Sequence, residues 1–168
     1  MPSTARKTSP QVQSNKAGIA PRDTGKLAEG LSQALADSFS LYVKTLGVHW
    51  NVVGPNFCGL HKLTEAQYED LEDAIDGLAE RIRALGRPAP AGFGEFREAG
   101  IVDAEIGPGT AEKMIAALIA DNEAVARRMR DFSDVAAEAR DKFSEDMLIA
   151  RMGRHGENVW MLRALIAR

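Results

Sequence analysis

An uninterrupted amphipathic stretch from Asn56 to Gly86 constrains the fold more than any other part of the sequence. Its apolar residues recur at steps of three and four, as they do on one face of an α-helix. Asn56 is placed to cap the start of this helix and Gly86 to end it. The pattern therefore predicts one long helix, whose apolar face is formed by Leu71, Ile75, Leu78, Ile82 and Leu85.

Three further stretches carry the same periodicity, and no stretch has the alternation of a strand. The helices are expected at 24–49, 110–132 and 144–167. The Gly- and Pro-rich segment 86–109 is too long for a tight turn and can cross from one end of a bundle to the other. Within it, Phe93, Phe96 and Ile101 could form a short helix that covers hydrophobic surface at a dimer contact. The prediction is an all-α four-helix bundle with a long crossover that contains a short helix.

The length and composition of the chain fit one such domain. The chain has 168 residues, of which 45% are hydrophobic, enough for one core and too few for two ordinary domains. No run approaches the roughly 18 apolar residues of a membrane span, and the lone Cys58 can form no internal disulfide. These features predict a cytoplasmic protein without a membrane partner, with the bundle at 23–168 and a disordered basic tail at 1–22.

Two pairs of possible metal ligands, His61 with Glu65 and Asp76 with Glu80, lie on the predicted long helix. With His61 at zero, the three acids lie at about 40°, 60° and 100° around the helix, on one face and away from the apolar stripe. His49 ends the preceding helix, and the turn after it brings that helix end toward His61. Imidazoles combined with carboxylates suit iron, zinc or manganese, and the carboxylate-rich pair favours a hard ion such as iron.

The spacing separates the two pairs into half-sites. Glu65 and Asp76 lie about 16 Å apart along a straight helix, whereas metal–ligand bonds are about 2 Å long. Two chains packed antiparallel about a twofold axis near Asp70 and Leu71 would join the histidine half of each to the carboxylate half of the other, giving two sites per dimer. The alternative is an ordinary solvated acidic face, to which Glu69 and Glu72 also belong.

Three segments carry a family resemblance: KTLGVHWNVVGPNFCGLHKL, EDAIDGLAERIRALG and, near the C-terminus, ENVWMLRAL. They resemble the Dps family of miniferritins, which protect DNA in starved bacteria. The specific part is the HW-N-x-x-G-x-x-F-x-x-LH motif followed by an acid and D-x-x-x-E. The match spans about residues 27–166. It implies a ferritin-like bundle and places the ferroxidase ligands on His49, His61, Glu65, Asp76 and Glu80.

The resemblance also implies an activity and an assembly. Members form a hollow dodecamer, oxidise Fe(II) at intersubunit centres with two iron ions each, prefer hydrogen peroxide as oxidant, and store ferric mineral inside. The alternative function is a mainly structural, nucleoid-compacting DNA-binding shell with weak ferroxidase activity. An intrabundle di-iron site is not expected, because none of the three histidines follows a glutamate by three residues.

The N-terminal tail is the expected DNA contact, through Arg6, Lys7, Lys16 and Arg22. It holds no acid, so removing its four positive charges from the net charge of −3 leaves −7 on the body, which should repel phosphate. Several basic arms on one shell could bind DNA by avidity, which would allow association with the nucleoid. The alternative is a tail without function.

Other residues have two readings each. Asp141, Glu145 and Asp146 could line an iron-attracting pore, since the EDMLIA run resembles the family's threefold-channel segment, or could simply complement the dipole of the last helix. His155 lies on that helix's apolar stripe and is expected in the core or an interface rather than as a ligand. Trp50 and Trp160 are expected to be packing residues, although the family's electron-donating tryptophan leaves Trp50 a minor functional role.

Overall fold

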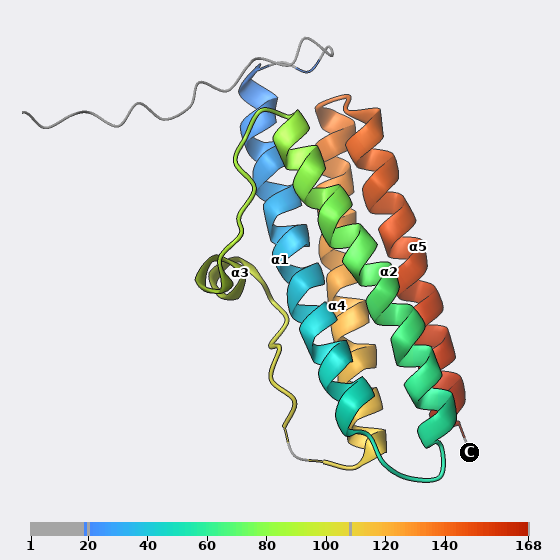
Figure 1. The fold of residues 1–168 in the computed structure, drawn as a ribbon. Helices are drawn as coiled ribbons and strands as arrows, with labels where there is room; N and C mark the ends of the chain where they lie inside the picture. The colour runs from blue at the N-terminus through green and yellow to red at the C-terminus, as the bar shows by residue number, and fades with distance from the viewer. Residues whose placement is uncertain (1–18, 20, 108, 168) are drawn as a thin grey trace, which may run out of the picture.

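A computed structural model describes residue 19 and residues 21–107 and 109–167 of the chain (Figure 1). Arg6, Lys7 and Lys16, the proposed DNA contacts, lie outside the described residues. The helices are α1 (Pro21–Asn51), α2 (Phe57–Ala84), α3 (Phe93–Ala99), α4 (Ala111–Glu138) and α5 (Lys142–Ile166), and the described residues form no strand. The prediction of an all-α four-helix bundle with a short helix in its crossover is confirmed.

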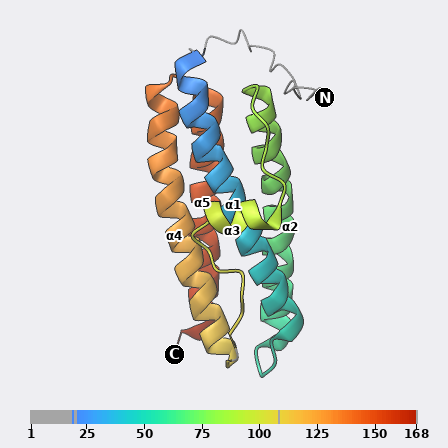
Figure 2. The same cartoon turned by 90° about the vertical axis from the view of Figure 1, so that its left-hand side faces the viewer.

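The long helices alternate in direction along the bundle, except across the crossover (Figure 1). α1 packs against α2 and α4, and α4 packs against α5. The crossover runs the length of the bundle, so α4 starts at the end where α1 finishes. α3 packs on α1 and lies across it (Figure 2). This topology leaves one long face of α2 without a helix over it.

The core is built from the apolar stripes expected from the sequence. On α2, Leu71, Leu78 and Ile82 are fully buried, while Ile75 is half-buried. The side chains around them come from all four long helices, including Leu31, Leu35, Leu118, Val125, Leu148 and Leu162. Burial of apolar surface at about 25 cal/mol per Å² is the main force that holds these helices together. None of the helices within the described ranges is long and apolar enough to cross a membrane.

The helix ends differ from expectation in some places and agree with it in others. α4 continues past Phe132 to Glu138, because Val135 and the buried Ala136 extend its apolar face. Asn56 occupies the N-cap position of α2 but makes no capping bond with its side chain, which donates instead to the Leu165 carbonyl oxygen at 3.3 Å. Gly86 ends α2 as predicted, with a φ of 81° that glycine adopts without strain.

α1 starts at Pro21, a residue favoured at the first helical position because its missing N–H has no helical partner. Arg22, an expected tail residue, therefore lies in the first turn of α1.

Asp37 of α1 fixes the crossover to the bundle. Its buried carboxylate accepts a 2.7 Å hydrogen bond from the Ile101 amide and pairs with Arg128 of α4 at 3.2 Å. Arg128 also donates to the Ala99 carbonyl at the end of α3, at 2.9 Å. One buried ion pair thus ties together α1, α3 and α4.

Candidate metal centre

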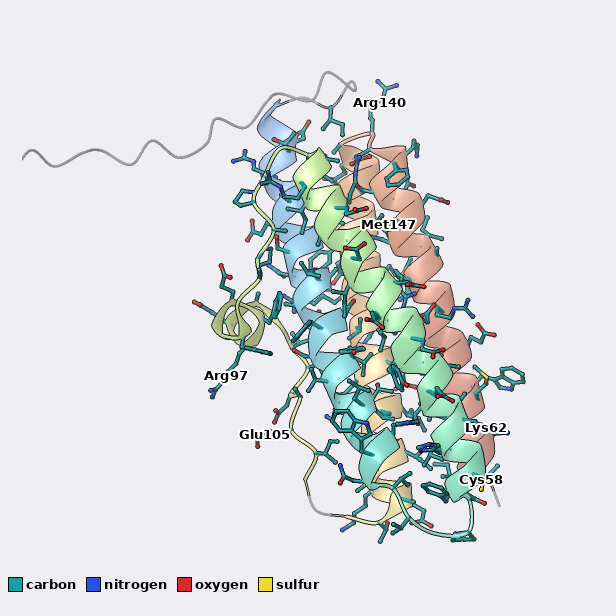
Figure 3. All side chains as sticks on the ribbon, viewed as in Figure 1. Cys58, Lys62, Arg97, Glu105, Arg140 and Met147 are labelled. Carbon is teal, nitrogen blue, oxygen red and sulfur yellow. The ribbon has the colours of Figure 1, made fainter. Side chains whose placement is uncertain are left out.

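His49 and His61 meet where α1 ends and α2 begins. Their rings are stacked, with centroids 3.7 Å apart and planes inclined by 15°. His49 is buried, His61 is half-buried, and Phe57 stacks on the outer face of His61 at 5.0 Å. In Figure 3, the labelled Cys58 and Lys62 mark this end of α2. The structure therefore brings the two predicted histidine ligands together within one chain.

Reciprocal hydrogen bonds hold the two rings. Nδ1 of His49 donates to the backbone oxygen of His61 at 2.9 Å, and Nδ1 of His61 donates to the backbone oxygen of His49 at 3.0 Å. A carbonyl oxygen only accepts, so each neutral ring must carry its proton on Nδ1. Each Nε2 is then the unprotonated nitrogen, the form in which histidine binds a metal ion. The backbone thus fixes the tautomer required of both ligands.

Two residues around the histidines were missed by the sequence reasoning. Thr64 Oγ1 lies 3.2 Å from His49 Nδ1 and donates to the Leu60 carbonyl at 2.8 Å. Tyr68 meets His49 edge to face, with centroids 5.2 Å apart. Desolvation raises the pKa of Tyr68, and the negative charge of Glu65 raises it further. Only the positions of Thr64 and Tyr68, three and seven residues after His61 on the same helix, could have indicated that they lie near it.

The three carboxylates predicted as ligands lie on the uncovered face of α2. Glu65, Asp76 and Glu80 are exposed, and the described residues offer Asp76 and Glu80 no ion-pair or hydrogen-bond partner. Within the described ranges no three ligand-type side chains converge on one point. The helix keeps Glu65 and Asp76 about 16 Å apart, so one chain presents two separate half-sites.

The residues expected near the twofold axis face inward. Leu71 is in the core, and Asp70 pairs with Arg151 of α5 at 2.8 Å. An axis at this height would therefore have to cross the exposed side of the helix, where Glu69 and Glu72 lie. Like charges facing each other there need cations between them to balance the repulsion.

The three proposed pore acids have different surroundings. Asp141 is buried, accepts from Arg81 at 2.6 Å and caps α5 through the Ser144 amide. Burial by itself would raise the pKa of Asp141, but the bonds from Arg81 and Ser144 outweigh it and keep the pKa below its usual value. Asp141 is thus a helix cap paired with Arg81, which favours the alternative interpretation, a partner of the helix dipole, for this residue. Glu145 pairs with Lys142 at 2.6 Å and Asp146 is exposed, so these two stay candidates.

His155 is a core residue, as expected. It is completely buried, and its Nδ1 lies 2.9 Å from Oδ1 of Asn122, while its Nε2 has no hydrogen-bond partner among the described residues. Burial lowers the pKa of His155 to about 3, and the nearby Arg151 acts in the same direction, against a smaller opposite effect of Asp70. The ring is therefore neutral and isolated from the half-sites on the surface of α2.

The prediction that both tryptophans are packing residues is wrong for the single chain. Trp50 is 69% exposed and Trp160 is 68% exposed. Among the described residues no ring contact joins Trp50 to His49 or His61. The remaining side chain of interest, Cys58, is exposed and free. The exposure of the two tryptophans could not be predicted from the spacing of apolar residues, because that spacing did not show which faces of their helices are turned to solvent.

Comparisons with known proteins agree with this architecture. The family model for a ferritin-like domain matches residues 28–168. The DNA protection during starvation protein of Brevibacillus brevis is 36% identical over 81% of this chain and 91% of its own length. A low temperature-induced protein of Nostoc is 41% identical, over 81% and 77%. The structure of the Vibrio cholerae Dps protein, described as one of the ferritin-like diiron-carboxylate proteins, superposes with a TM-score of 0.86 at 28% identity, covering 95% of this chain and all of that one.

Proposed function

The chain belongs to the Dps family of ferritin-like proteins, and we propose that it is a ferroxidase that stores iron and limits oxidative damage to DNA. The observation that carries the proposal is the stacked, tautomer-fixed histidine pair, which has carboxylates on the same uncovered face of α2. The proposed ligands are His49, His61, Glu65, Asp76 and Glu80. The carboxylates would attract Fe(II), the substrate, and the histidine nitrogens would complete its coordination.

Each complete centre would combine the histidine half of one chain with the carboxylate half of another. Asp76 and Glu80 would hold a first Fe(II) with His49 of the neighbouring chain, and His61 with Glu65 would hold a second. Hydrogen peroxide, the preferred oxidant, would take one electron from each ion and, with two protons, give two water molecules. The pairing avoids one-electron reduction of peroxide, which releases hydroxyl radical. The Fe(III) product would be stored as mineral inside a closed shell.

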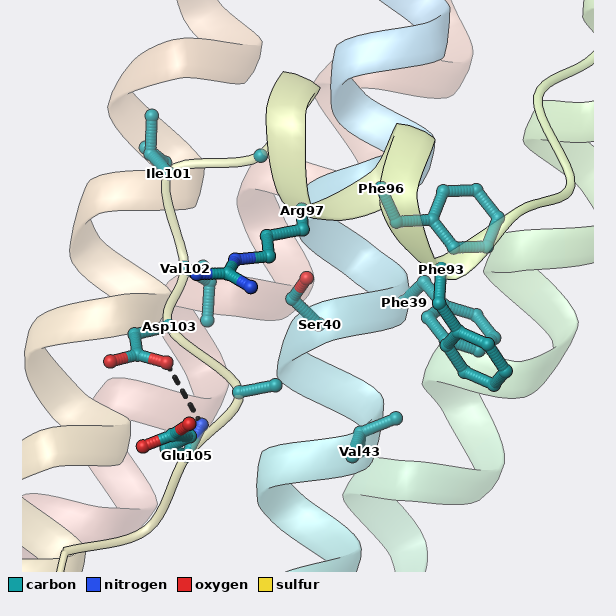
Figure 4. A pocket seen from close by; sticks show the side chains of 12 residues that line it. Phe39, Ser40, Val43, Phe93, Phe96, Arg97, Ile101, Val102, Asp103 and Glu105 are labelled. Carbon is teal, nitrogen blue, oxygen red and sulfur yellow. Dashed lines mark hydrogen bonds between the residues drawn. The ribbon is translucent and has the colours of Figure 1, made fainter.

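We further propose that the shell is a dodecamer built on this twofold contact. A groove of about 640 Å³ between α1 and the crossover, drawn in Figure 4, supports a contact between copies, because its lining combines the aromatic rings of Phe39 and Phe96 with the charged Arg97. Phe93 beside it is 79% exposed and Ile101 is 53% exposed. Glu145 and Asp146 stay the proposed iron entrance of the shell, and a cytoplasmic location stays a prediction.

The proposed function is tested by loading the purified protein with Fe(II) without oxygen and then adding peroxide. We expect ferric absorbance to form much faster than in protein-free buffer, saturating at two Fe(II) per centre, and faster with peroxide than with oxygen. Hydroxyl radical measured by spin trapping should fall below the protein-free value. An oxidation rate equal to that of buffer would show that the protein is not a ferroxidase.

Binding to DNA would be a separate activity of residues 1–22, whose basic side chains contrast with the acidic body. We predict that deletion of residues 1–20 removes retention of DNA in a gel and leaves Fe(II) oxidation intact, because no proposed ligand lies in the tail. Retention by the full-length protein should weaken steeply with salt, as expected of phosphate contacts. A truncated shell that still retains DNA, or an affinity independent of salt, would contradict this assignment. Full DNA protection without ferroxidase activity would favour the structural alternative.

A further inference from the structure

A continuous series of aromatic rings leads from the histidine pair along α2 and α1 to the crossover. Tyr68 of α2 contacts His49 edge to face, and Tyr42 of α1 contacts Tyr68 in the same way, at a centroid distance of 6.2 Å and an interplanar angle of 82°. Phe39 follows Tyr42 at 6.3 Å. All these separations lie within the range of direct ring contact. Both tyrosines are half-buried.

The series of rings changes from tyrosine to phenylalanine after Tyr42. Phe39 stacks on Phe96 at 4.5 Å and meets Phe93 at 5.7 Å, and Figure 4 shows these three rings together beside the crossover. A phenol can give up an electron and its proton together, whereas a phenyl ring has no such proton and is much harder to oxidise. Oxidation could therefore reach Tyr42 but go no further along the rings.

We propose that Tyr68 supplies the second electron to peroxide when a centre holds only one Fe(II), and that Tyr42 accepts the resulting radical. This inference rests on the proposed ferroxidase function. The geometry favours Tyr68 over Trp50, because Tyr68 contacts the ring of His49, whereas Trp50 is largely exposed and makes no ring contact with either histidine among the described residues.

The step balances. Peroxide accepts one electron from Fe(II) and one from Tyr68; the Tyr68 phenol and the solvent each provide a proton, the O–O bond breaks and two waters form. The products are Fe(III) and a neutral tyrosyl radical. The radical then moves to Tyr42 when that phenol passes an electron and a proton to Tyr68. The next Fe(II) substrate ion, with a proton from solvent, restores the phenol and becomes Fe(III).

The tyrosine pair would contribute most when little Fe(II) is bound to the protein. With two Fe(II) ions in a centre, both electrons come from iron and the tyrosines are not needed. With one ion, peroxide would otherwise be reduced by a single electron and would release hydroxyl radical. The tyrosine pair would thus extend the protection to partly filled centres.

The test uses the full-length assembled protein loaded with less than one Fe(II) per centre, mixed with peroxide and frozen rapidly for electron paramagnetic resonance. We expect a tyrosyl signal in the wild type and its loss in Tyr68→Phe, which keeps the ring against His49 but removes the phenol. Hydroxyl radical trapped in solution should rise in that variant, and the rise should be confined to low loading. Trp50→Phe is the matched control and should keep the signal.

Tyr42→Phe tests the second step: the radical should still form but be reduced sooner by added Fe(II), because it cannot move away from the iron. An unchanged radical lifetime would refute transfer to Tyr42. A signal that survives in Tyr68→Phe, whether or not it disappears in Trp50→Phe, would overturn the role of Tyr68. Neither result concerns the proposed function itself, which fails only if the wild type at full loading oxidises Fe(II) no faster than buffer.

Discussion

Two double variants should each abolish rapid Fe(II) oxidation, yet a mixture of them should recover part of it. His49→Ala/His61→Ala removes the nitrogen half of every centre. Asp76→Ala/Glu80→Ala removes the carboxylate half, whose side chains are exposed and leave the core stripe of α2 untouched. In a mixed dimer one centre has lost both halves, while the other takes its histidines from the chain that keeps them and its carboxylates from the chain that keeps those. Random pairing should restore roughly a quarter of the centres, because half of the dimers are mixed.

Peroxide-driven oxidation in co-refolded mixtures, shown by mass spectrometry to contain both chains, is the measurement. Glu69→Ala/Glu72→Ala is the matched control, since it removes the same charge from the same face of α2 but no proposed ligand, and it should stay active. A ligand set confined to one chain predicts no recovery. A mixture that shows only the background rate of the separate variants would therefore exclude the intersubunit centre.

The second large effect is a pH dependence of stability that comes from His155. The pKa of this buried ring is about 3 in the folded chain, against an ordinary value of 6.5. Between these values the unfolded chain binds the proton and the folded chain does not. The stability that comes from keeping the ring neutral is thus complete above about pH 6.5 and falls by about 1.4 kcal/mol per pH unit as the pH drops toward 3.

His155→Gln removes the titrating group, so its free energy of unfolding should vary less with pH in this window. The measurement is urea unfolding from pH 4 to 7 at a fixed protein concentration, since assembly contributes to the apparent stability. The slope of the free energy of unfolding against pH should differ between variant and wild type by the equivalent of about one proton. Nitrogen NMR of the imidazole gives a direct check, because the ring should stay neutral throughout. Equal slopes, or a ring that titrates near its ordinary pKa, would contradict the assignment.

The helices could be predicted from the sequence because their signals are local. The apolar steps through Leu71, Leu78 and Ile82 identify α2 and its buried face, and Gly86 marks its end. The end of α4 was placed too early because alanines carry its last turns. Alanine favours helix but contributes little to an apolar stripe.

The parts of the site that depend on positions along one helix, or on the short turn before it, were predictable. A helical wheel groups Glu65 with Asp76, and the turn before α2 brings His49 toward His61. Contacts that join distant parts of the chain were not predictable: the ion pair that neutralises Asp141 comes from Arg81, which is 60 residues away along the chain. The outward position of Trp50 was equally hidden, because a spacing pattern does not say which faces other chains will cover.

If the proposed centre spans two chains, the distance of about 16 Å between the two half-sites on α2 would make metal occupancy and assembly a single equilibrium. A free chain would then offer iron an incomplete set of ligands and hold the ion only weakly. Iron that bridged two chains would stabilise their association by the same free energy by which association strengthens iron binding. Newly made chains would therefore bind little iron before a shell exists to receive the mineral. When iron is scarce, the subunits would associate more weakly.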